Sequence, residues 1–199
     1  ESTYKYIDSG KKCHEFTTQH TNESAVRALY CEVGPIDKIF AFTTDLVREK
    51  SISLQQEIKQ YAYFKEIVKK FVTNQDSTNI IDCPYHENMP LHDSMQDIVA
   101  MSNMIMAIKK SFGSEEVKLH ADMTGGMRNA SMLMLGIMRF LQYSNIKMGG
   151  IFYSNWQNKT IEDAKEIYHF FDLVAGAEDF VNYGSARELI KYFADLPKS

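Results

Sequence analysis

The sequence is poor in the residues that mark disulfide-bonded domains, flexible linkers and metal sites. It contains three cysteines and four prolines in 199 residues. Cys13, Cys31 and Cys83 are widely spaced and form no Cys-x-x-Cys pair. Neither a disulfide framework nor a zinc site is therefore expected, and a reducing, cytoplasmic compartment fits best. With no internal repeat and no linker rich in proline, glycine and serine, the sequence predicts one compact domain over residues 1–199.

Excess positive charge and long apolar runs are also lacking. Lys and Arg together number 22 against 26 Asp and Glu, which gives a formal net charge of −4. Because a long nucleic acid is usually bound by a broad basic face, we expect no such partner. A small phosphate-bearing ligand remains compatible, since a few backbone amides and one or two cations can hold it. No apolar run reaches membrane-spanning length, so no membrane partner is expected.

What the sequence does contain is an alternation of short apolar runs with longer amphipathic segments. A β-hairpin is predicted from strands at residues 3–7 and 13–17. Further strands are predicted at 38–43, 79–83, 117–122 and 148–153, and helices at 22–30, 54–71, 95–112, 129–142 and 161–193. Thr21 or Asn22 is expected to cap the first helix, and the last is expected to break near Gly176 and Tyr183-Gly184. This order predicts an α/β fold: a Rossmann-like, mostly parallel sheet flanked by helices, with an N-terminal β-hairpin.

The strongest signal for a binding site is the segment between the strand at 117–122 and the helix at 129–142. Two glycines allow the backbone positive φ values and close approach to a ligand, and the free amides of the following helix favour an anion. Thr124 can donate its hydroxyl, Arg128 can bind a phosphate with two hydrogen bonds, and Asp122 is expected to order the loop by accepting amide hydrogen bonds. The candidate residues are Asp122, Thr124, Gly125, Gly126, Met127, Arg128 and Asn129.

Other interpretations of this glycine pair differ in strength. Two glycines also make an ordinary tight turn between a strand and a helix, and the bare pattern leaves that interpretation open. The absence of Gly-Lys-Ser/Thr argues against a triphosphate-binding P-loop. The spacing also differs from Gly-x-Gly-x-x-Gly, which weakens a dinucleotide-binding interpretation.

The helix predicted at 129–142 has almost no polar face. A helix that is apolar all round must be covered on both sides. One side is expected to face the sheet and the other a second copy of the chain, with burial under the C-terminal helices as the alternative. If this helix lies on a two-fold axis, two copies of the preceding loop converge, which suits a symmetric ligand.

Taken together, these motifs resemble a known family. Asp-x-Thr-Gly-Gly followed by a helix resembles the signature of CRISPR-associated Rossmann-fold (CARF) domains, the sensors of type III CRISPR systems. Further similarities run in order over essentially the whole chain: Tyr4-Lys5-Tyr6, Thr43-Thr44, Ile81-Asp82-Cys83-Pro84 and Phe180-Val181-Asn182-Tyr183-Gly184. The resemblance implies a homodimer that binds cyclic tetra- or hexa-adenylate, a cyclic oligoadenylate second messenger, across its two-fold axis and so activates a fused effector in antiviral defence.

The resemblance also implies where further ligand contacts lie. The family's second contact region follows its first strand, and Ser2 and Thr3 occupy that place here. That first apolar strand is absent, and the chain begins at Glu1, so we expect residues upstream. An effector is expected elsewhere, since neither the arginine–histidine pair of a HEPN nuclease nor the histidine-rich set of a deaminase is present. Secondary candidates at strand ends are Thr43, Thr44, Tyr153, Ser154 and Asn155.

Two enzymatic alternatives remain open. A ring nuclease would open the cyclic ligand without a metal, with His86 or His120 as general acid or base. His120 shares a strand with Asp122 and is expected to be a hydrogen-bonded sheet histidine, and His86 an exposed loop residue. A nucleotide hydrolase on a Rossmann-like fold would need a metal or nucleophile set, which the sequence does not display. No catalytic residue, metal or cofactor is therefore assigned.

Overall fold

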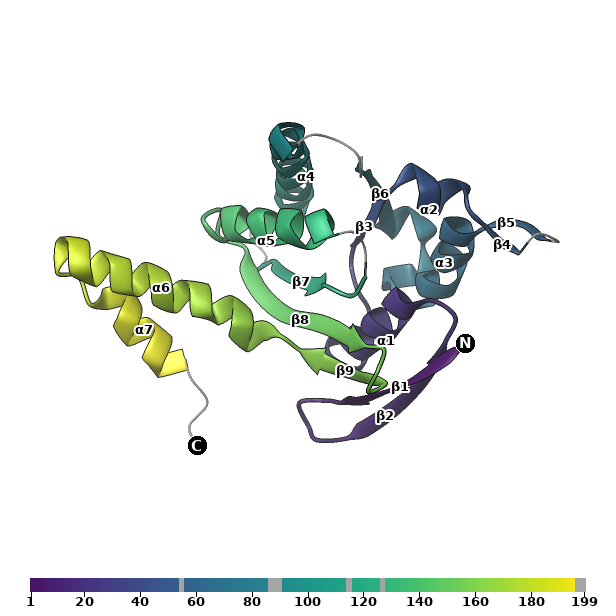
Figure 1. Cartoon of the computed structure of the whole chain (residues 1–199), viewed down its shortest axis with the longest axis horizontal. Coiled ribbons are helices and arrows are strands. Elements are labelled where there is room, and N and C mark those ends of the chain that lie inside the picture. The colour runs from purple at the N-terminus through teal and green to yellow at the C-terminus, as the bar shows by residue number, and fades with distance from the viewer. Residues whose placement is uncertain (54–55, 86–90, 114–115, 126–127, 196–199) are drawn as a thin grey trace. The chain divides into compact units, whose positions relative to one another are not determined.

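The computed structural model of the chain describes residues 1–53, 56–85, 91–113, 116–125 and 128–195. The chain divides into two compact units, residues 1–162 and residues 163–199. The strands are β1 (Ser2–Ile7), β2 (Cys13–Thr18), β3 (Ile39–Thr43), β4 (Ser51–Ser53), β5 (Gln56–Lys59), β6 (Ile80–Pro84), β7 (Lys118–Asp122), β8 (Lys147–Asn155) and β9 (Thr160–Asp163) (Figure 1). The helices are α1 (Thr21–Val33), α2 (Asp45–Glu49), α3 (Gln60–Val68), α4 (Leu91–Ser111), α5 (Arg128–Gln142), α6 (Lys165–Tyr183) and α7 (Arg187–Asp195).

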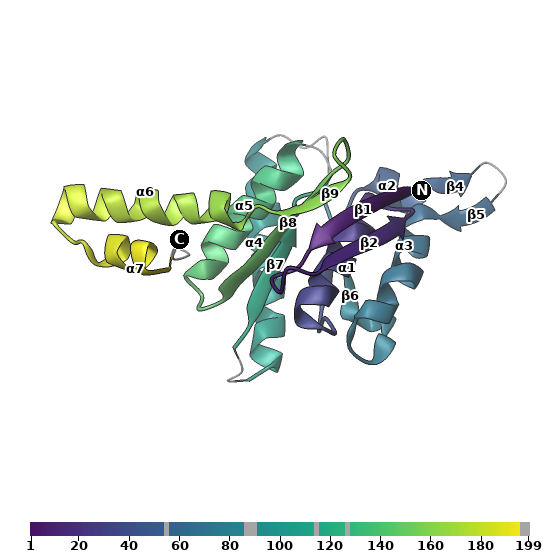
Figure 2. The same ribbon diagram turned by 90° about the horizontal axis from the view of Figure 1, so that it is seen from below.

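The predicted α/β architecture with an N-terminal β-hairpin is confirmed. Strands β1 and β2 pair antiparallel from Ser2↔Thr18 to Ile7↔Cys13 (Figure 2). The hairpin belongs to a five-stranded sheet in the order β2-β1-β9-β8-β7, in which β1 runs parallel to β9 and β7 parallel to β8. A second sheet pairs β3 with β6 in parallel, and β4 and β5 form a short antiparallel pair. The strands predicted at 38–43, 79–83, 117–122 and 148–153 are thus confirmed as β3, β6, β7 and β8.

Helices cover β7 and β8 on both faces. Ala25 and Ala28 of α1 share an apolar cluster with Tyr4, Tyr6 and Phe152. Helices α4 and α5, which lie above β7 in Figure 1, form a second cluster that takes in partly buried strand residues. The apolar faces of these helices therefore meet the sheet from opposite sides, as in other α/β proteins.

Two stretches predicted as helix are strands. The helix predicted at 54–71 begins only at Gln60, because the residues before it form β5, which pairs with β4 through Ser51↔Lys59 and Ser53↔Gln56. The helical spacing is real from Tyr61 onward, and Tyr61 and Val68 are buried on α3. The start of the helix predicted at 161–193 is β9, which pairs with β1 and places Ile161 in the core beside Tyr4 and Tyr6. Strand pairing overrides the helical pattern in both cases: β5 pairs with the adjacent β4, and β9 lies between β1 and β8 in the five-stranded sheet.

Helices α6 and α7 form the second unit. The predicted break near Gly176 is wrong, because α6 continues through it from Lys165 to Tyr183. The glycine instead allows α7 to approach closely, since a Cβ there would lie 3.0 Å from the backbone nitrogen of Leu189. The predicted break at Gly184 is confirmed by its left-handed φ of 67°. Within the described residues, no helix combines the length and the apolar character needed to cross a membrane.

Candidate functional site

The loop that follows β7 lies where two parallel strands end. The Met123 N–H donates to the carbonyl of Phe152 at 2.8 Å, so the ladder with β8 continues one residue beyond Asp122. Gly125 has a φ of 77°, the left-handed conformation that favours glycine, and α5 begins at Arg128. Gly126 and Met127 lie outside the described residues, as do the side chains of Arg128 and Asn129. The predicted sequence of strand, loop and helix is confirmed.

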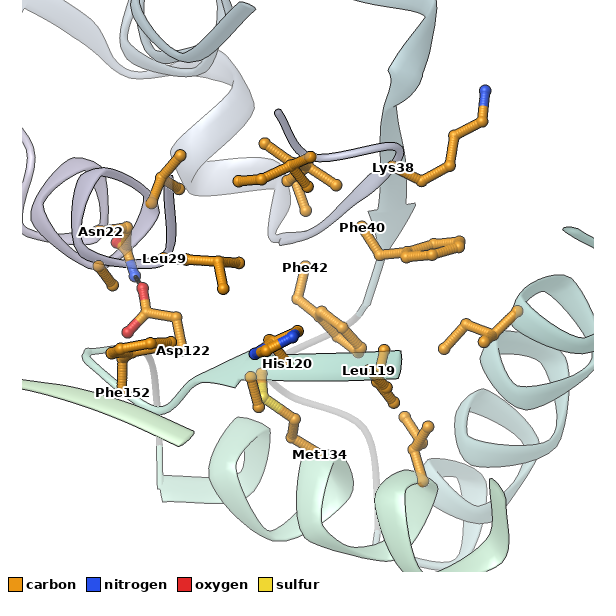
Figure 3. A pocket seen from close by; sticks show the side chains of 18 of the residues that line it. Asn22, Leu29, Lys38, Phe40, Phe42, Leu119, His120, Asp122, Met134 and Phe152 are labelled. Carbon is orange, nitrogen blue, oxygen red and sulfur yellow. Dashed lines mark hydrogen bonds between the residues drawn. The ribbon is translucent and has the colours of Figure 1, made fainter. Parts of the chain in front are cut away.

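Asp122 holds this loop in place from its first residue. Its Oδ1 accepts a hydrogen bond of 2.8 Å from the Thr124 N–H, which is the ordering contact expected of it. Its Oδ2 accepts a 2.7 Å hydrogen bond from Nδ2 of Asn22, and the same amide nitrogen donates to the Thr124 carbonyl at 2.8 Å. Figure 3 shows the Asn22 and Asp122 side chains pointing toward each other. The start of α1 is therefore joined to the loop at two points.

The Asp122 carboxyl has an unusual ionisation. Burial raises its pKa to about 6, although the hydrogen bonds from Thr124 and Asn22 act in the opposite direction by stabilising the charged form. A carboxylic acid with this pKa changes charge between mildly acidic and neutral pH. Both carboxylate oxygens already accept hydrogen bonds within the protein, so the group orders the loop rather than offering a free acceptor.

Thr124 and Ser154 link the loop, β8 and α1 through buried hydroxyl groups. The Ser154 N–H donates to Oγ1 of Thr124 at 2.7 Å. The Ser154 hydroxyl lies 2.8 Å from that of Ser24, which itself donates to the Thr21 carbonyl at 2.6 Å. Since Ser24 has one proton to donate, Ser154 is the donor between the two serines. Both candidate ligand residues are buried and stabilise the position of the loop.

Thr43 and Thr44 occupy the corresponding place at the end of β3. The Thr43 hydroxyl donates to the Asp82 carboxylate on β6. Thr44 is the N-cap of α2 and accepts a hydrogen bond from the Val47 N–H at 3.4 Å. Both threonines are buried, and both line the same cavity as Asp122 and Thr124. The structure therefore brings the ends of β3 and β7 to one cavity, although they are far apart in the sequence.

That cavity has a volume of about 800 Å³ and extends between β3 and β7. Its lining is largely apolar, and Figure 3 shows Phe42, Leu29, Leu119 and Met134 around it. The polar part is contributed by Asn22, Thr43, Thr44, Asp122 and Thr124. An apolar cavity with a few grouped polar residues is typical of a ligand-binding site.

The remaining secondary candidates do not line this cavity. Tyr153 is exposed, because alternation along β8 directs it to the face opposite Phe152 and Ser154. The hydroxyl of Ser2 accepts a 3.1 Å hydrogen bond from Lys159, and that of Thr3 lies 3.0 Å from the hydroxyl of Thr17. The side-chain oxygen of Asn155 accepts hydrogen bonds from two backbone amides of the turn between β8 and β9.

His120 lies in the sheet and is hydrogen-bonded there, as expected. Its Nδ1 accepts a hydrogen bond of 2.9 Å from the Gly150 N–H, so its neutral form carries the proton on Nε2. Its ring occupies the space that a Cβ on Gly149 would need. His86, the other candidate acid or base, lies outside the described residues. Among the residues that are described, no three His, Cys, Asp or Glu side chains gather in a way that would hold a metal ion.

Asn22 is the main site residue that sequence reasoning missed. It was expected, with Thr21, to cap α1, but the N-cap is His20 and no side chain caps this helix. Its partners Asp122 and Thr124 are about a hundred residues away, and no local pattern connects them. No protein-family model matches the chain, and no curated protein matches it.

Proposed function

We propose that this chain is a CARF-type sensor domain that binds a cyclic oligoadenylate at a homodimer interface and thereby activates a fused effector in type III CRISPR defence. Cyclic tetra-adenylate is the favoured ligand and cyclic hexa-adenylate the alternative. The observation that carries the proposal is the loop from Asp122 to Gly125, which follows a parallel strand, contains a left-handed glycine and leads into α5. In open α/β sheets, ligands bind beyond the carboxyl ends of the strands.

The chemistry of this loop suits a phosphodiester. The first backbone amides of a helix lack partners within the helix and carry partial positive charge, so the start of α5 favours an anion. Arg128 is the first residue of that helix and adds a cation. The two oxygens of the Asp122 carboxylate accept hydrogen bonds from Asn22 and from the Thr124 N–H. The carboxylate therefore faces these two groups, and the glycine backbone of the loop can approach the ligand.

The dimer is supported by exposed apolar side chains on α4 and α5. Met132 and Phe140 of α5 are 64% and 51% exposed, and Met95 and Val99 of α4 are exposed as well. The two helices pack together, and a Cβ on Gly136 would lie 3.2 Å from Ile98. Exposed apolar groups on adjoining helices mark a surface for association. Two copies of α5 paired around a two-fold axis would bring the two preceding loops together.

Replacing both Met132 and Phe140 by glutamate is expected to convert the dimer to a monomer. Each change places a charge where an apolar contact is expected, and burying an unpaired charge costs several kcal/mol. Light scattering coupled to gel filtration at micromolar concentration measures the mass directly. The control is Trp156→Glu, the same kind of change at an exposed aromatic residue between β8 and β9. A double variant that keeps the dimer mass would contradict this interface.

The Arg128→Ala variant is expected to bind cyclic tetra-adenylate about 10- to 150-fold more weakly, which corresponds to the ~1.5–3 kcal/mol of a charged hydrogen bond. Gly126→Val is expected to abolish binding, because a branched side chain blocks the approach of a phosphate. Calorimetric titration with cyclic tri-, tetra- and hexa-adenylate measures the affinities and the preferred ring size.

The matched control for the arginine is Arg139→Ala, near the far end of the same helix, where the guanidinium hydrogen-bonds to Gln142. This variant should bind like the wild type. Wild-type affinity in Arg128→Ala or in Gly126→Val would disprove the corresponding contact. Recovery of linear products from the titrated ligand would indicate ring cleavage, the enzymatic alternative, in place of simple binding.

A further inference from the structure

A group of polar side chains outside the cavity joins the N-terminal hairpin to the far end of α1. Asp8 lies in the turn between β1 and β2, His14 on β2 and Cys31 on α1. Nε2 of His14 lies 2.8 Å from Oδ2 of Asp8, and Nδ1 lies 3.7 Å from Sγ of Cys31. One ring nitrogen therefore contacts a carboxylate and the other a thiol. We call these three residues the thiol triad.

Asp8 determines which nitrogen of His14 carries the proton. Hydrogen bonds from the His14 ring and from the Lys12 N–H, the latter at 2.8 Å, lower the pKa of Asp8 below its ordinary value of 3.8. An ionised carboxylate can only accept hydrogen bonds, so the proton between Asp8 and His14 belongs to Nε2. In the neutral ring, Nδ1 is then an acceptor and faces the sulfur of Cys31. This nitrogen can take the thiol proton.

The Cys31 thiol depends on such a base to react. Burial raises the pKa of Cys31 above its ordinary value of 9.0, and the carboxylates of Asp8 and Glu32 raise it further, although Lys12 acts in the opposite direction. The thiol is therefore protonated at neutral pH. Since the thiolate is the form of cysteine that attacks an electrophile, a base that removes the proton during the attack supplies the nucleophile.

The surroundings of the thiol favour a small, uncharged reagent. Cys31 is partly buried and packs against the apolar cluster that contains Tyr6 and Phe16. The neighbouring Glu32 is held in place, because its Oε1 accepts hydrogen bonds from the Tyr6 hydroxyl at 2.6 Å and from the Ser9 N–H at 2.8 Å. A fixed carboxylate beside the thiol disfavours an anionic reagent, and partial burial disfavours a bulky one.

We propose that Cys31 is an oxidation site, at which a small hydroperoxide such as hydrogen peroxide converts the thiol to a sulfenic acid with His14 as the base. The sulfur forms a bond to one peroxide oxygen while the O–O bond breaks. The thiol proton passes to Nδ1 of His14 and then to the departing oxygen, which leaves as water. The sulfur loses two electrons and the peroxide gains them, so the step needs no other reactant.

The thiol triad is separate from the loop that follows β7. Cys31 lies about 13 Å along α1 from Asn22, at a rise of ~1.5 Å per residue. Asp8, His14 and Cys31 do not line the cavity described above. The inference is therefore independent of the ligand that the loop binds, and it holds whether or not that ligand is a cyclic oligoadenylate.

The cysteines of the wild-type chain provide the first test. Cys13 is exposed, Cys31 partly exposed and Cys83 buried, so exposure alone predicts the fastest oxidation at Cys13. The thiol triad predicts that Cys31 forms sulfenic acid about tenfold faster than Cys13 or more, since a positioned base contributes ~10²–10⁴-fold. Treatment with micromolar hydrogen peroxide, trapping with dimedone and mass spectrometry give each rate, because cleavage after Arg27 places Cys13 and Cys31 in different peptides. A rate at Cys31 no greater than that at Cys13 would overturn the proposal.

The second test replaces the base. His14→Gln keeps an N–H donor for Asp8 but cannot take a proton, so sulfenic acid formation at Cys31 should slow about tenfold or more while that at Cys13 stays unchanged. A purely structural role predicts the opposite change at Cys31, because a loosened hairpin would expose the thiol. The matched control is His169→Gln, which alters a histidine 3.2 Å from Asp172 on α6 and should leave both rates unchanged. An unchanged rate at Cys31 in His14→Gln would contradict the assignment, and the wild-type comparison decides if that variant fails to fold.

Discussion

Replacing Asn22 by aspartate is expected to lower the free energy of unfolding by about 3 kcal/mol at pH 7. The amide nitrogen of Asn22 donates to Asp122 at 2.7 Å and to the Thr124 carbonyl at 2.8 Å. Aspartate loses both hydrogen bonds and places a carboxylate against a carboxylate, in a site where burial already raises the pKa of Asp122 to about 6. The hydrogen bond to the Asp122 carboxylate contributes ~1.5–3 kcal/mol and the one to the neutral carbonyl about 1 kcal/mol, and the like charges add repulsion.

The stability lost in the Asn22→Asp variant should be smaller at pH 5 than at pH 7. In the wild type the folded pKa of Asp122, about 6, lies above its ordinary value of 3.8. The folded state then binds more protons between these values, so this group's contribution to stability is full below about pH 4 and is lost as the pH rises through 6. A second carboxylate raises the pKa of the pair further. Protonation removes the repulsion, so the gap between variant and wild type should narrow from pH 7 to pH 5.

Urea denaturation at the two pH values measures both effects. The control is Asn158→Asp, the same chemical change at an exposed asparagine in the turn between β8 and β9. Its effect should stay within about 0.5 kcal/mol at either pH, as for most surface substitutions. If Asn22→Asp costs as little as this control at pH 7, the bond between α1 and the loop does not stabilise the protein. A loss that is equal at both pH values would instead exclude the Asp122 carboxylate as its cause.

Most of the fold could be predicted because its strands and helices carry strong local patterns. The run at 39–42 is apolar throughout, and the segment at 129–142 has no strand-like alternation. The strand predicted at 38–43 and the helix predicted at 129–142 both lie close to their observed bounds. Strand β9 spans only Thr160–Asp163, too few residues for a clear pattern, and lies between β1 and β8 in the sheet. Because β1 comes at the other end of the unit, the local sequence around Ile161 contains no sign of that partner.

The strand, loop and helix around the candidate site could be predicted from the sequence, but the hydrogen bonds of its side chains could not. The loop from Asp122 to Gly125 combines a strand end, two glycines and a helix start, which are all local features. A hydroxyl is free to contact a ligand only if it has no hydrogen-bond partner elsewhere in the protein. The hydroxyls of Thr43, Thr124 and Ser154 each have such a partner on another element, which the local sequence does not reveal. Tyr153 is an exception. Successive side chains of a strand point to opposite faces, so the sequence alone places Tyr153 on the face opposite Ser154.

Replacing Gly149 by alanine is expected to lower the free energy of unfolding by about 3 kcal/mol. A Cβ at this position would lie 2.5 Å from Nδ1 and 2.6 Å from Nε2 of His120, and closer still to Cε1. The register between β7 and β8 shifts here, from Leu119↔Met148 to Ala121↔Ile151. The ring of His120 therefore crosses β8 over the extra residue of a bulge, where glycine gives close approach. Moving the ring also breaks its 2.9 Å hydrogen bond with the Gly150 N–H.

A double-mutant cycle with His120→Ala isolates this contact. Overpacking costs ~1–3 kcal/mol and a lost hydrogen bond about 1 kcal/mol, and both come from the histidine ring. In the His120→Ala background the added methyl meets no ring, so Gly149→Ala should then cost under about 1 kcal/mol and the coupling energy should be about 2 kcal/mol. Gly10→Ala, in the hairpin turn where a Cβ would lie 3.3 Å from Oδ1 of Asp8, is the control and should cost under about 1 kcal/mol. Additive effects of the two changes would show that Gly149 is required by the backbone of the bulge rather than by His120.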